Sequence, residues 1–398
     1  MIWRLFAMSA LTSLLVGCGG GTSQPTVSST EADDAVVELG APVFTSDVPG
    51  AVALDIAGNG VSDPTVAWIG PDGVWAATIE ISTGVMAPPS DVDMGLEPIV
   101  HPIERPAVAV APDGRVDIAF TSFVEDGAAS VFLSQGGSEP EPISGDPEPE
   151  TNLVHVTLMG GRPVLSWLED ATLSVGVSDG GHITERESVD DRTCDCCNPV
   201  PLAVGESLVV AYRDFETVDG QVVRNVAAVS SADGGVSFSD VVPIADDDWF
   251  ISGCPFSGPD VASVDGELLV AWMDGRQSIH PDQASTSIWV DRSTDGGASF
   301  GSDIKVAGEG INRWPVLAVD ASSVAYLVWE KSGPEGGLAY ASSSDGGHVW
   351  QDHGLLVARG DTGSGDPRSP SLIVHDGHLV VTWADSVGGH VAAWSLQR

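Results

Sequence analysis

The segments SADGGVSF (residues 231–238), STDGGASF (293–300) and SSDGGHVW (343–350) share one pattern, and a shorter copy, VSDGG, occupies residues 177–181. Each full copy has a serine, an aspartate two residues later, two glycines and a final aromatic residue. An aspartate side chain accepts hydrogen bonds from turn amides, and glycine adopts positive φ without strain, so the pattern predicts a β-hairpin turn. The aromatic residue would fill a gap between two sheets. We therefore expect Asp233, Asp295 and Asp345 to be structural.

A longer unit recurs around these turns. It has a proline, an apolar strand, a turn with Asp or Gly, and a second apolar strand that ends in an aromatic residue. Alternating apolar positions between closely spaced turns predict an all-β fold. The copies follow one another at about 45 to 60 residues, which is the repeat length of propeller blades. Seven copies are present, with second strands ending at Trp68, Phe120, Trp167, Tyr212, Trp272, Trp329 and Trp383.

One four-stranded unit cannot bury both of its faces, so several units are expected to pack around an axis as a β-propeller. The Ser-x-Asp-x-Gly segments resemble the Asp-box of sialidases and related BNR-repeat proteins, and the resemblance covers about residues 41–398. It implies a single propeller domain over that range. Sialidases have six blades, whereas seven aromatic-ended strands are present here. Seven blades are favoured, and a six-bladed ring closed by the first copy is the alternative.

The propeller topology that the resemblance implies puts the start of each first strand, and the loop after each second strand, on one ligand-binding face. Arg105, Arg313 and Arg368 stand just before first-strand prolines, and Arg213 and Arg276 follow second strands. Converging arginines could hold a carboxylate, phosphate or sulfate. The alternative is that each arginine pairs with a local aspartate at a blade junction.

Two carboxylates at matching positions of adjacent copies, Asp214 and Asp274, are candidates for a catalytic pair in glycosidic chemistry. Their alternative role is capping or ion pairing at a strand end. Sialidases use an arginine triad and a tyrosine nucleophile. Since no tyrosine follows Arg368 and the Arg-Ile-Pro motif is absent, we do not expect sialic acid hydrolysis.

Four cysteines, Cys194, Cys196, Cys197 and Cys254, precede the first strands of two adjacent copies. This register predicts that Cys254 lies beside the other three despite its distance in sequence. In an oxidising compartment the set favours two disulfides, and a bridge between the adjacent Cys196 and Cys197 is one option for their pairing. The rival is a copper or zinc site of clustered thiolates. No other cofactor is expected. The CDCC segment resembles that of uncharacterised exported sialidase-like proteins. This resemblance does not indicate which activity, if any, the protein has.

The first residues form a signal sequence, with Arg4 ahead of an apolar run from Leu5 to Val16 that is too short to span a bilayer. The run ends in Leu-Val-Gly-Cys, which resembles the lipobox of bacterial lipoproteins and implies that Cys18 is lipidated. Residues 1–18 are thus read as the signal segment and residues 19–40, rich in small, polar and acidic residues, as a flexible tether. By resemblance to lipoprotein sorting in Gram-negative bacteria, Gly19 after the cysteine implies the outer membrane, with the domain facing the periplasm or the cell surface.

The chain carries 57 acidic and 16 basic residues, a formal net charge of −41 spread along its length. Such a surface argues against nucleic acid as a partner. Two functions remain open. The first is a lipid-anchored propeller that binds an acidic glycan or another surface protein. The second is a glycoside hydrolase or polysaccharide lyase acting on acidic sugars.

Overall fold

The computed structural model describes residues 39–124, 127–143, 151–245, 249–251, 253–276, 285–361 and 365–396. Cys18 and the proposed signal and tether segments lie outside these ranges. All regular elements in the described part are β-strands. No helix long and apolar enough to cross a membrane occurs among these residues.

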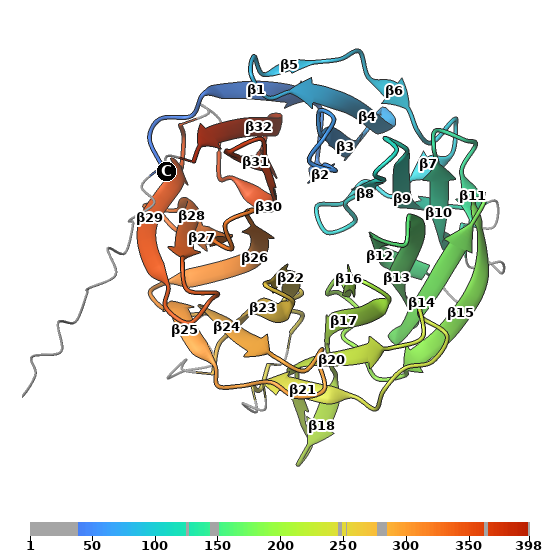
Figure 1. The fold of residues 1–398 in the computed structure, drawn as a ribbon, viewed down its shortest axis with the longest axis vertical. Coiled ribbons are helices and arrows are strands. Elements are labelled where there is room, and N and C mark those ends of the chain that lie inside the picture. The colour runs from blue at the N-terminus through green and yellow to red at the C-terminus, as the bar shows by residue number, and fades with distance from the viewer. Residues whose placement is uncertain are drawn as a thin grey trace, which may run out of the picture. The chain divides into compact units, whose positions relative to one another are not determined.

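Seven antiparallel sheets, the blades, are arranged in a ring (Figure 1). Blade 1 contains β2 (Ala53–Ala57), β3 (Thr65–Gly70), β4 (Gly73–Glu80), β5 (Val85–Met86) and β6 (Ser90–Asp91). Blade 2 contains β7 (Glu97–Pro98), β8 (Ala107–Val110), β9 (Val116–Phe123), β10 (Ala129–Gln135) and β11 (Glu141–Pro142). Blade 3 contains β12 (Thr151–Met159), β13 (Arg162–Glu169), β14 (Thr172–Asp179) and β15 (His182–Asp190).

Blade 4 contains β16 (Val200–Val204), β17 (Ser207–Arg213), β20 (Val226–Ser231) and β21 (Val242–Ala245), with a separate hairpin of β18 (Glu216–Val218) and β19 (Gln221–Val223). Blade 5 contains β22 (Asp260–Val264), β23 (Glu267–Asp274), β24 (Ser287–Ser293) and β25 (Ile304–Ala307). Blade 6 contains β26 (Ile311–Val319), β27 (Ala325–Ser332), β28 (Gly337–Ser343) and β29 (Gln351–Ala358). Blade 7 contains β30 (Arg368–His375), β31 (His378–Ala384), β32 (Gly388–Ser395) and β1 (Phe44–Pro49).

The first strands of the repeats, β2, β8, β12, β16, β22, β26 and β30, line the centre, and each contacts the next around the ring (Figure 1). The ring closes where β1, from the start of the domain, pairs with β32 near its end. This pairing leaves few free sheet edges. The seven-bladed prediction is confirmed, and the six-bladed alternative is excluded because each of the seven copies forms its own sheet.

Each blade interface contains one of the seven aromatic residues that end the second strands. The buried apolar side chains form seven main clusters, one between each pair of neighbouring blades, and each cluster includes the aromatic residue of the following blade. Trp272, for example, packs between blades 4 and 5 and is fully buried. Burial of such large rings explains why an aromatic residue recurs at this position.

The three Ser-x-Asp-x-Gly segments form the turns between the third and fourth strands of blades 4, 5 and 6. In blade 4, Ser231 donates a hydrogen bond to Asp233 (2.8 Å), and the Gly235 amide donates one to Ser231 (2.9 Å). Hydrogen bonds from the Ser237 hydroxyl and amide lower the pKa of Asp233 to about 2. Asp295 and Asp345 accept corresponding bonds. These contacts are internal to each turn.

The indole N–H groups of two of the aromatic residues at the blade interfaces, Trp329 and Trp383, allow a matched test. Trp329 donates to Asn312 Oδ1 (2.9 Å), whereas the buried Trp383 N–H has no hydrogen-bond partner. Both side chains are about 1% exposed. Trp329→Phe leaves a buried amide oxygen unpaired, so we expect it to lower the free energy of unfolding by about 1–3 kcal/mol more than Trp383→Phe does. Denaturant unfolding of both variants measures the difference; equal losses would show that the hydrogen bond contributes no net stability.

Candidate functional site

The face on which the first strands begin has an unusual backbone. Leu153, Trp314 and Ser369 have φ values of 54°, 47° and 49°, although none of them is glycine. Each lies at a register irregularity near the start of β12, β26 or β30. Phe256, in the segment before β22, also has positive φ, 51°. Left-handed backbone at large residues costs free energy and is concentrated at binding and catalytic sites. We call this face the channel mouth.

A small cavity of about 40 Å³ lies at the channel mouth. Its lining includes Arg105, Asp260, Trp314 and Ser369, from the segments that lead into four different blades or from their first strands. Space of this size holds an ordered water rather than a sugar ring. A ligand would therefore bind over this opening and not inside it.

The three arginines predicted to converge are placed in two surroundings. Arg105 is half-buried and donates to the Pro370 carbonyl (3.0 Å), which ties blade 2 to blade 7. Its charge acts on Asp260. Arg313 and Arg368 instead lie near the Glu330 carboxyl: burial raises the pKa of Glu330, and both arginines oppose that rise. Two of the three arginines thus share a neighbour.

Arg213 and Arg276, predicted as ligand-binding residues, are held by other parts of the protein. Arg213 is about 1% exposed and donates to the carbonyls of Ser257, Arg224 and Met273 at 2.8 to 3.2 Å. Arg276 is bonded to Asp274 and Asp303, and its guanidinium lies 4.3 Å from the ring centre of Trp289. Both side chains link elements of the fold in the described structure.

The two candidate catalytic carboxylates lie in different surroundings. Asp274 is buried and accepts hydrogen bonds from the Trp272 indole (2.9 Å) and from Arg276 (2.8 Å). Asp214 accepts a bond from the Phe215 amide (2.7 Å). Burial, and then the charges of Asp190 and Glu216, raise the pKa of Asp214 to about 6. Asp214 and Asp274 share no hydrogen bond or ion pair within the described part of the structure, and Asp274 is paired with Arg276, as the ion-pair alternative expects.

Glu330 is a further candidate, which the sequence places after a second strand on the ligand-binding face but which is not among the predicted catalytic or binding residues. It follows Trp329 directly, near the end of β27, the second strand of blade 6. This end of β27 lies on the face of the channel mouth. Its side chain is about 7% exposed, Oε1 accepts a hydrogen bond from Ser332 (3.1 Å), and Oε2 has no partner. A buried carboxyl beside two arginines is a typical acid–base candidate. Its position after an aromatic strand end was visible in the sequence, but its burial was not.

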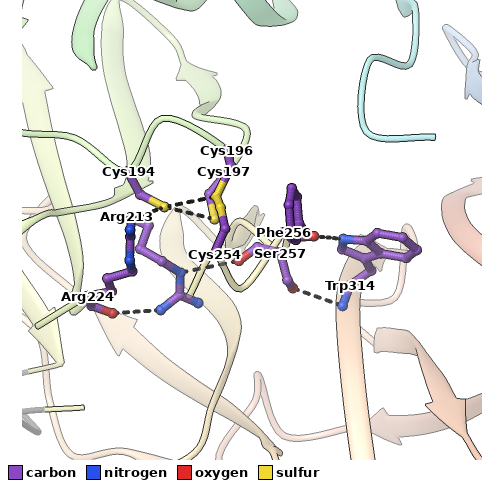
Figure 2. The surroundings of a disulfide bond; sticks show 9 residues. All are labelled: Cys194, Cys196, Cys197, Arg213, Arg224, Cys254, Phe256, Ser257 and Trp314. Carbon is purple, nitrogen blue, oxygen red and sulfur yellow. Dashed lines mark hydrogen bonds between the residues drawn. A yellow bond between two sulfur atoms is a disulfide. The ribbon is translucent and has the colours of Figure 1, made fainter. Parts of the chain in front are cut away.

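The cysteines meet where the segments leading into blades 4 and 5 lie side by side (Figure 2). Cys196 and Cys254 form a disulfide with Cα atoms 6.5 Å apart, so the register prediction for Cys254 is confirmed. A Cys196–Cys197 bridge, which was one option for the pairing, is not formed because Cys196 is bonded to Cys254, and these four cysteines form one disulfide where two were expected. Cys194 and Cys197 are free and buried.

The free thiols are in direct contact. Cys194 Sγ lies 3.3 Å from Cys197 Sγ, and Arg224 Nη1 donates to Cys194 Sγ at 2.8 Å. The hydrogen bond between the two thiols lowers the pKa of Cys194 to about 6; burial opposes this shift, and the charges of Arg224 and Arg213 add to it. Burial raises the pKa of Cys197.

The same sulfur atoms raise the question of a metal. Ligand atoms of Cys194, Asp195, Cys196 and Cys254 all lie within 4.8 Å of one another, so the cluster could hold a metal ion. Thiolates are ligands for copper or zinc, but disulfide sulfurs are not thiolates. The group therefore fits a soft metal only when the Cys196–Cys254 bond is reduced.

No protein-family model and no curated protein sequence matches the chain. Solved structures do match. A protein of unknown function from Dyadobacter fermentans has 11% identity and a TM-score of 0.54, covering 90% of this chain and 99% of its own. The polysaccharide lyase Uly1 has 10% identity and a TM-score of 0.52, covering 88% and 91%. A fungal alcohol oxidase solved with copper has 11% identity and a TM-score of 0.52, covering 91% and 76%. These similarities establish the propeller fold.

Asp260 provides a pH test of the channel mouth. Its carboxylate accepts the amides of Leu317 (2.7 Å) and Val261 (2.9 Å), and burial raises its pKa to about 6. The folded protein therefore binds the proton more tightly than the unfolded chain does, and its stability falls as pH rises from about 4 through 6. We expect wild type to lose about 1–3 kcal/mol relative to Asp260→Asn between pH 4 and pH 8. Unfolding measured across this range would show parallel curves if the carboxyl had an ordinary pKa.

Proposed function

We propose that this protein is a glycan-binding propeller that recognises acidic sugars over the channel mouth. The observation that carries the proposal is that Arg313 lies opposite the buried Glu330 in the pairing of β26 with β27, and that the charges of Arg313 and Arg368 both act on the Glu330 carboxyl. No salt bridge among the described residues includes either arginine, so their guanidinium groups are available to an anion. Guanidinium groups bind carboxylates and sulfates through two parallel hydrogen bonds.

Aromatic side chains next to the arginines support a sugar ligand. Trp314 adjoins Arg313 and donates through its indole N–H to the Phe256 carbonyl, while the Phe256 ring is about 45% exposed. Aromatic rings such as these offer flat apolar surfaces for the C–H faces of sugars. The mouth thus combines anion donors with aromatic surface.

A polysaccharide lyase or glycoside hydrolase is the second candidate, and Glu330 is the observation that favours it. A carboxyl with a raised pKa can serve as a general acid or base, and neighbouring arginines can neutralise an acidic sugar. Uly1, which shares the fold, is a polysaccharide lyase. Sialidase chemistry has less support, because the three tyrosines of the chain, Tyr212, Tyr326 and Tyr340, are all buried.

The arginine pair gives the main test of the proposal. Arg313→Ala and Arg368→Ala should each weaken binding of a uronic-acid oligosaccharide by about 1.5–3 kcal/mol, the contribution of a hydrogen bond to a charged group. Arg292→Ala is the matched control, since Arg292 pairs with Glu267 away from the channel mouth. A glycan array followed by calorimetry measures these changes. Equal affinity in all three variants would refute the proposed site; product release by wild type but not by Glu330→Gln would establish the enzyme.

We also propose that Cys18 carries the lipid that anchors the domain outside the cytoplasm. Only its sequence context supports this: an apolar run followed by Leu-Val-Gly-Cys. Cys18→Ser should remove the anchor, so membrane fractionation should find the variant in the soluble fraction or as unprocessed precursor. Wild-type distribution and mass in that variant would contradict lipidation.

A further inference from the structure

The Cys194 sulfur is in contact with two other cysteine sulfurs and with a guanidinium group. It lies 3.5 Å from Cys196 Sγ, which belongs to the disulfide, and 3.3 Å from the free Cys197 thiol. Arg224 donates to it at 2.8 Å (Figure 2). A guanidinium group at hydrogen-bond distance stabilises a thiolate, which is the nucleophilic form of cysteine. A nucleophile and a disulfide sulfur are thus adjacent.

The surrounding backbone fixes these positions. The two segments that carry the cysteines approach so closely that a Cβ at Gly258 would lie 2.4 Å from the Asn198 carbonyl oxygen. Arg213 donates to the Ser257 carbonyl, in the segment that carries Cys254, and to the carbonyl of Arg224, whose side chain contacts Cys194. The Cys194 amide also donates to the Arg213 carbonyl (2.9 Å). The sulfurs are therefore held together by blades 4 and 5 independently of the disulfide.

We propose that the four cysteines form a thiol–disulfide exchange site in which the Cys194 thiolate attacks Cys196 Sγ. The Cys194–Cys196 bond forms as the Cys196–Cys254 bond breaks, and the electron pair of the broken bond stays on Cys254 Sγ. That thiolate then takes a proton from water or reacts onward. The internal step needs no external oxidant or reductant, because one disulfide replaces another.

Cys254 is the cysteine of the site that would react with compounds in solution. It is the least buried of the four cysteines, and the exposed Phe256 is two residues away. Its thiolate can attack an external disulfide, forming a mixed disulfide at Cys254 and releasing one thiol of that compound. The substrate class is therefore a disulfide that reaches this rim from solvent. This inference is independent of the proposed glycan binding.

The experiment traps Cys254 in the native, full-length protein. Wild type and Cys197→Ser, which removes the other free thiol, are incubated without reductant with N-ethylmaleimide or glutathione disulfide, then acid-quenched and digested with trypsin. Cleavage after Arg192, Arg213, Arg224 and Arg276 separates fragment 193–213 from fragment 225–276, which carries Cys254. Exchange therefore releases fragment 225–276 from its partner, with modified Cys254, and leaves a Cys194–Cys196 bridge inside fragment 193–213.

We expect Cys254 to become modified progressively by both reagents, in wild type and in Cys197→Ser. Arg224→Gln should slow this modification about tenfold, since it removes the donor that holds the attacking sulfur. Arg292→Gln, remote from the cluster, should not slow it. If either variant fails to fold, the wild-type time course still decides.

Three results would overturn the proposal. The first is that fragments 193–213 and 225–276 stay linked throughout and that any label is found on Cys194. The second is an intact mass that shows two disulfides and no free thiol in wild type. The third is stoichiometric copper or zinc with four reduced cysteines, which would identify a metal site. Labelling by N-ethylmaleimide without any glutathione adduct would confirm the internal exchange and refute reaction with external disulfides.

Discussion

The structure depends on one repeated contact, the packing of an aromatic side chain from each second strand against the preceding blade. Because a four-stranded sheet has two apolar faces, it is stable here only with a neighbour on each side, and the ring must close. The seven aromatic residues occupy seven interfaces. Pairing of β1 with β32 completes the last blade with residues from both ends of the domain. The start of every first strand is thereby brought to one opening.

The same aromatic residues explain why several polar candidates are structural. Trp167 donates to Glu169, which binds Arg186, and Trp272 donates to Asp274, which binds Arg276. In blade 7, Asp385 follows Trp383 by the same two positions and contacts His390, which stacks on that indole. In blades 3 and 5 the acid two residues after the aromatic thus holds a guanidinium group against the ring, as cation–π geometry favours. Asp274 and Arg276 belong to this recurring unit.

The sequence was sufficient for the fold because its signals are local and periodic. Strand alternation, turn chemistry and the aromatic spacing each lie within one blade, and together they predicted seven blades. The register of the repeat also placed Cys254 beside Cys194 through Cys197. What it could not provide was the partner of a side chain that is held by another blade. Arg213 bonds Ser257 and Met273 of blade 5 and its leading segment, so its burial depended on a neighbour about 44 or more residues away. The exact disulfide pairing and the burial of Glu330 were hidden for the same reason.

The segment from Cys254 to Ser257 joins the two chemically distinct parts of this face. Its cysteine is bonded to Cys196, its Phe256 and Ser257 accept hydrogen bonds from Trp314 at the channel mouth, and its Ser257 carbonyl accepts one from Arg213. Residues 254 to 257 therefore connect the disulfide sulfur of Cys254 to the indole ring of Trp314. A change in the bonding of Cys254 therefore acts on the same backbone that holds Trp314 next to Arg313. Since Trp314 adopts a left-handed conformation that its surroundings must maintain, this segment is one of the supports of the proposed sugar surface. Blades 4, 5 and 6 thus form one continuous unit at the mouth, with the cysteines at one side and Arg313 at the other.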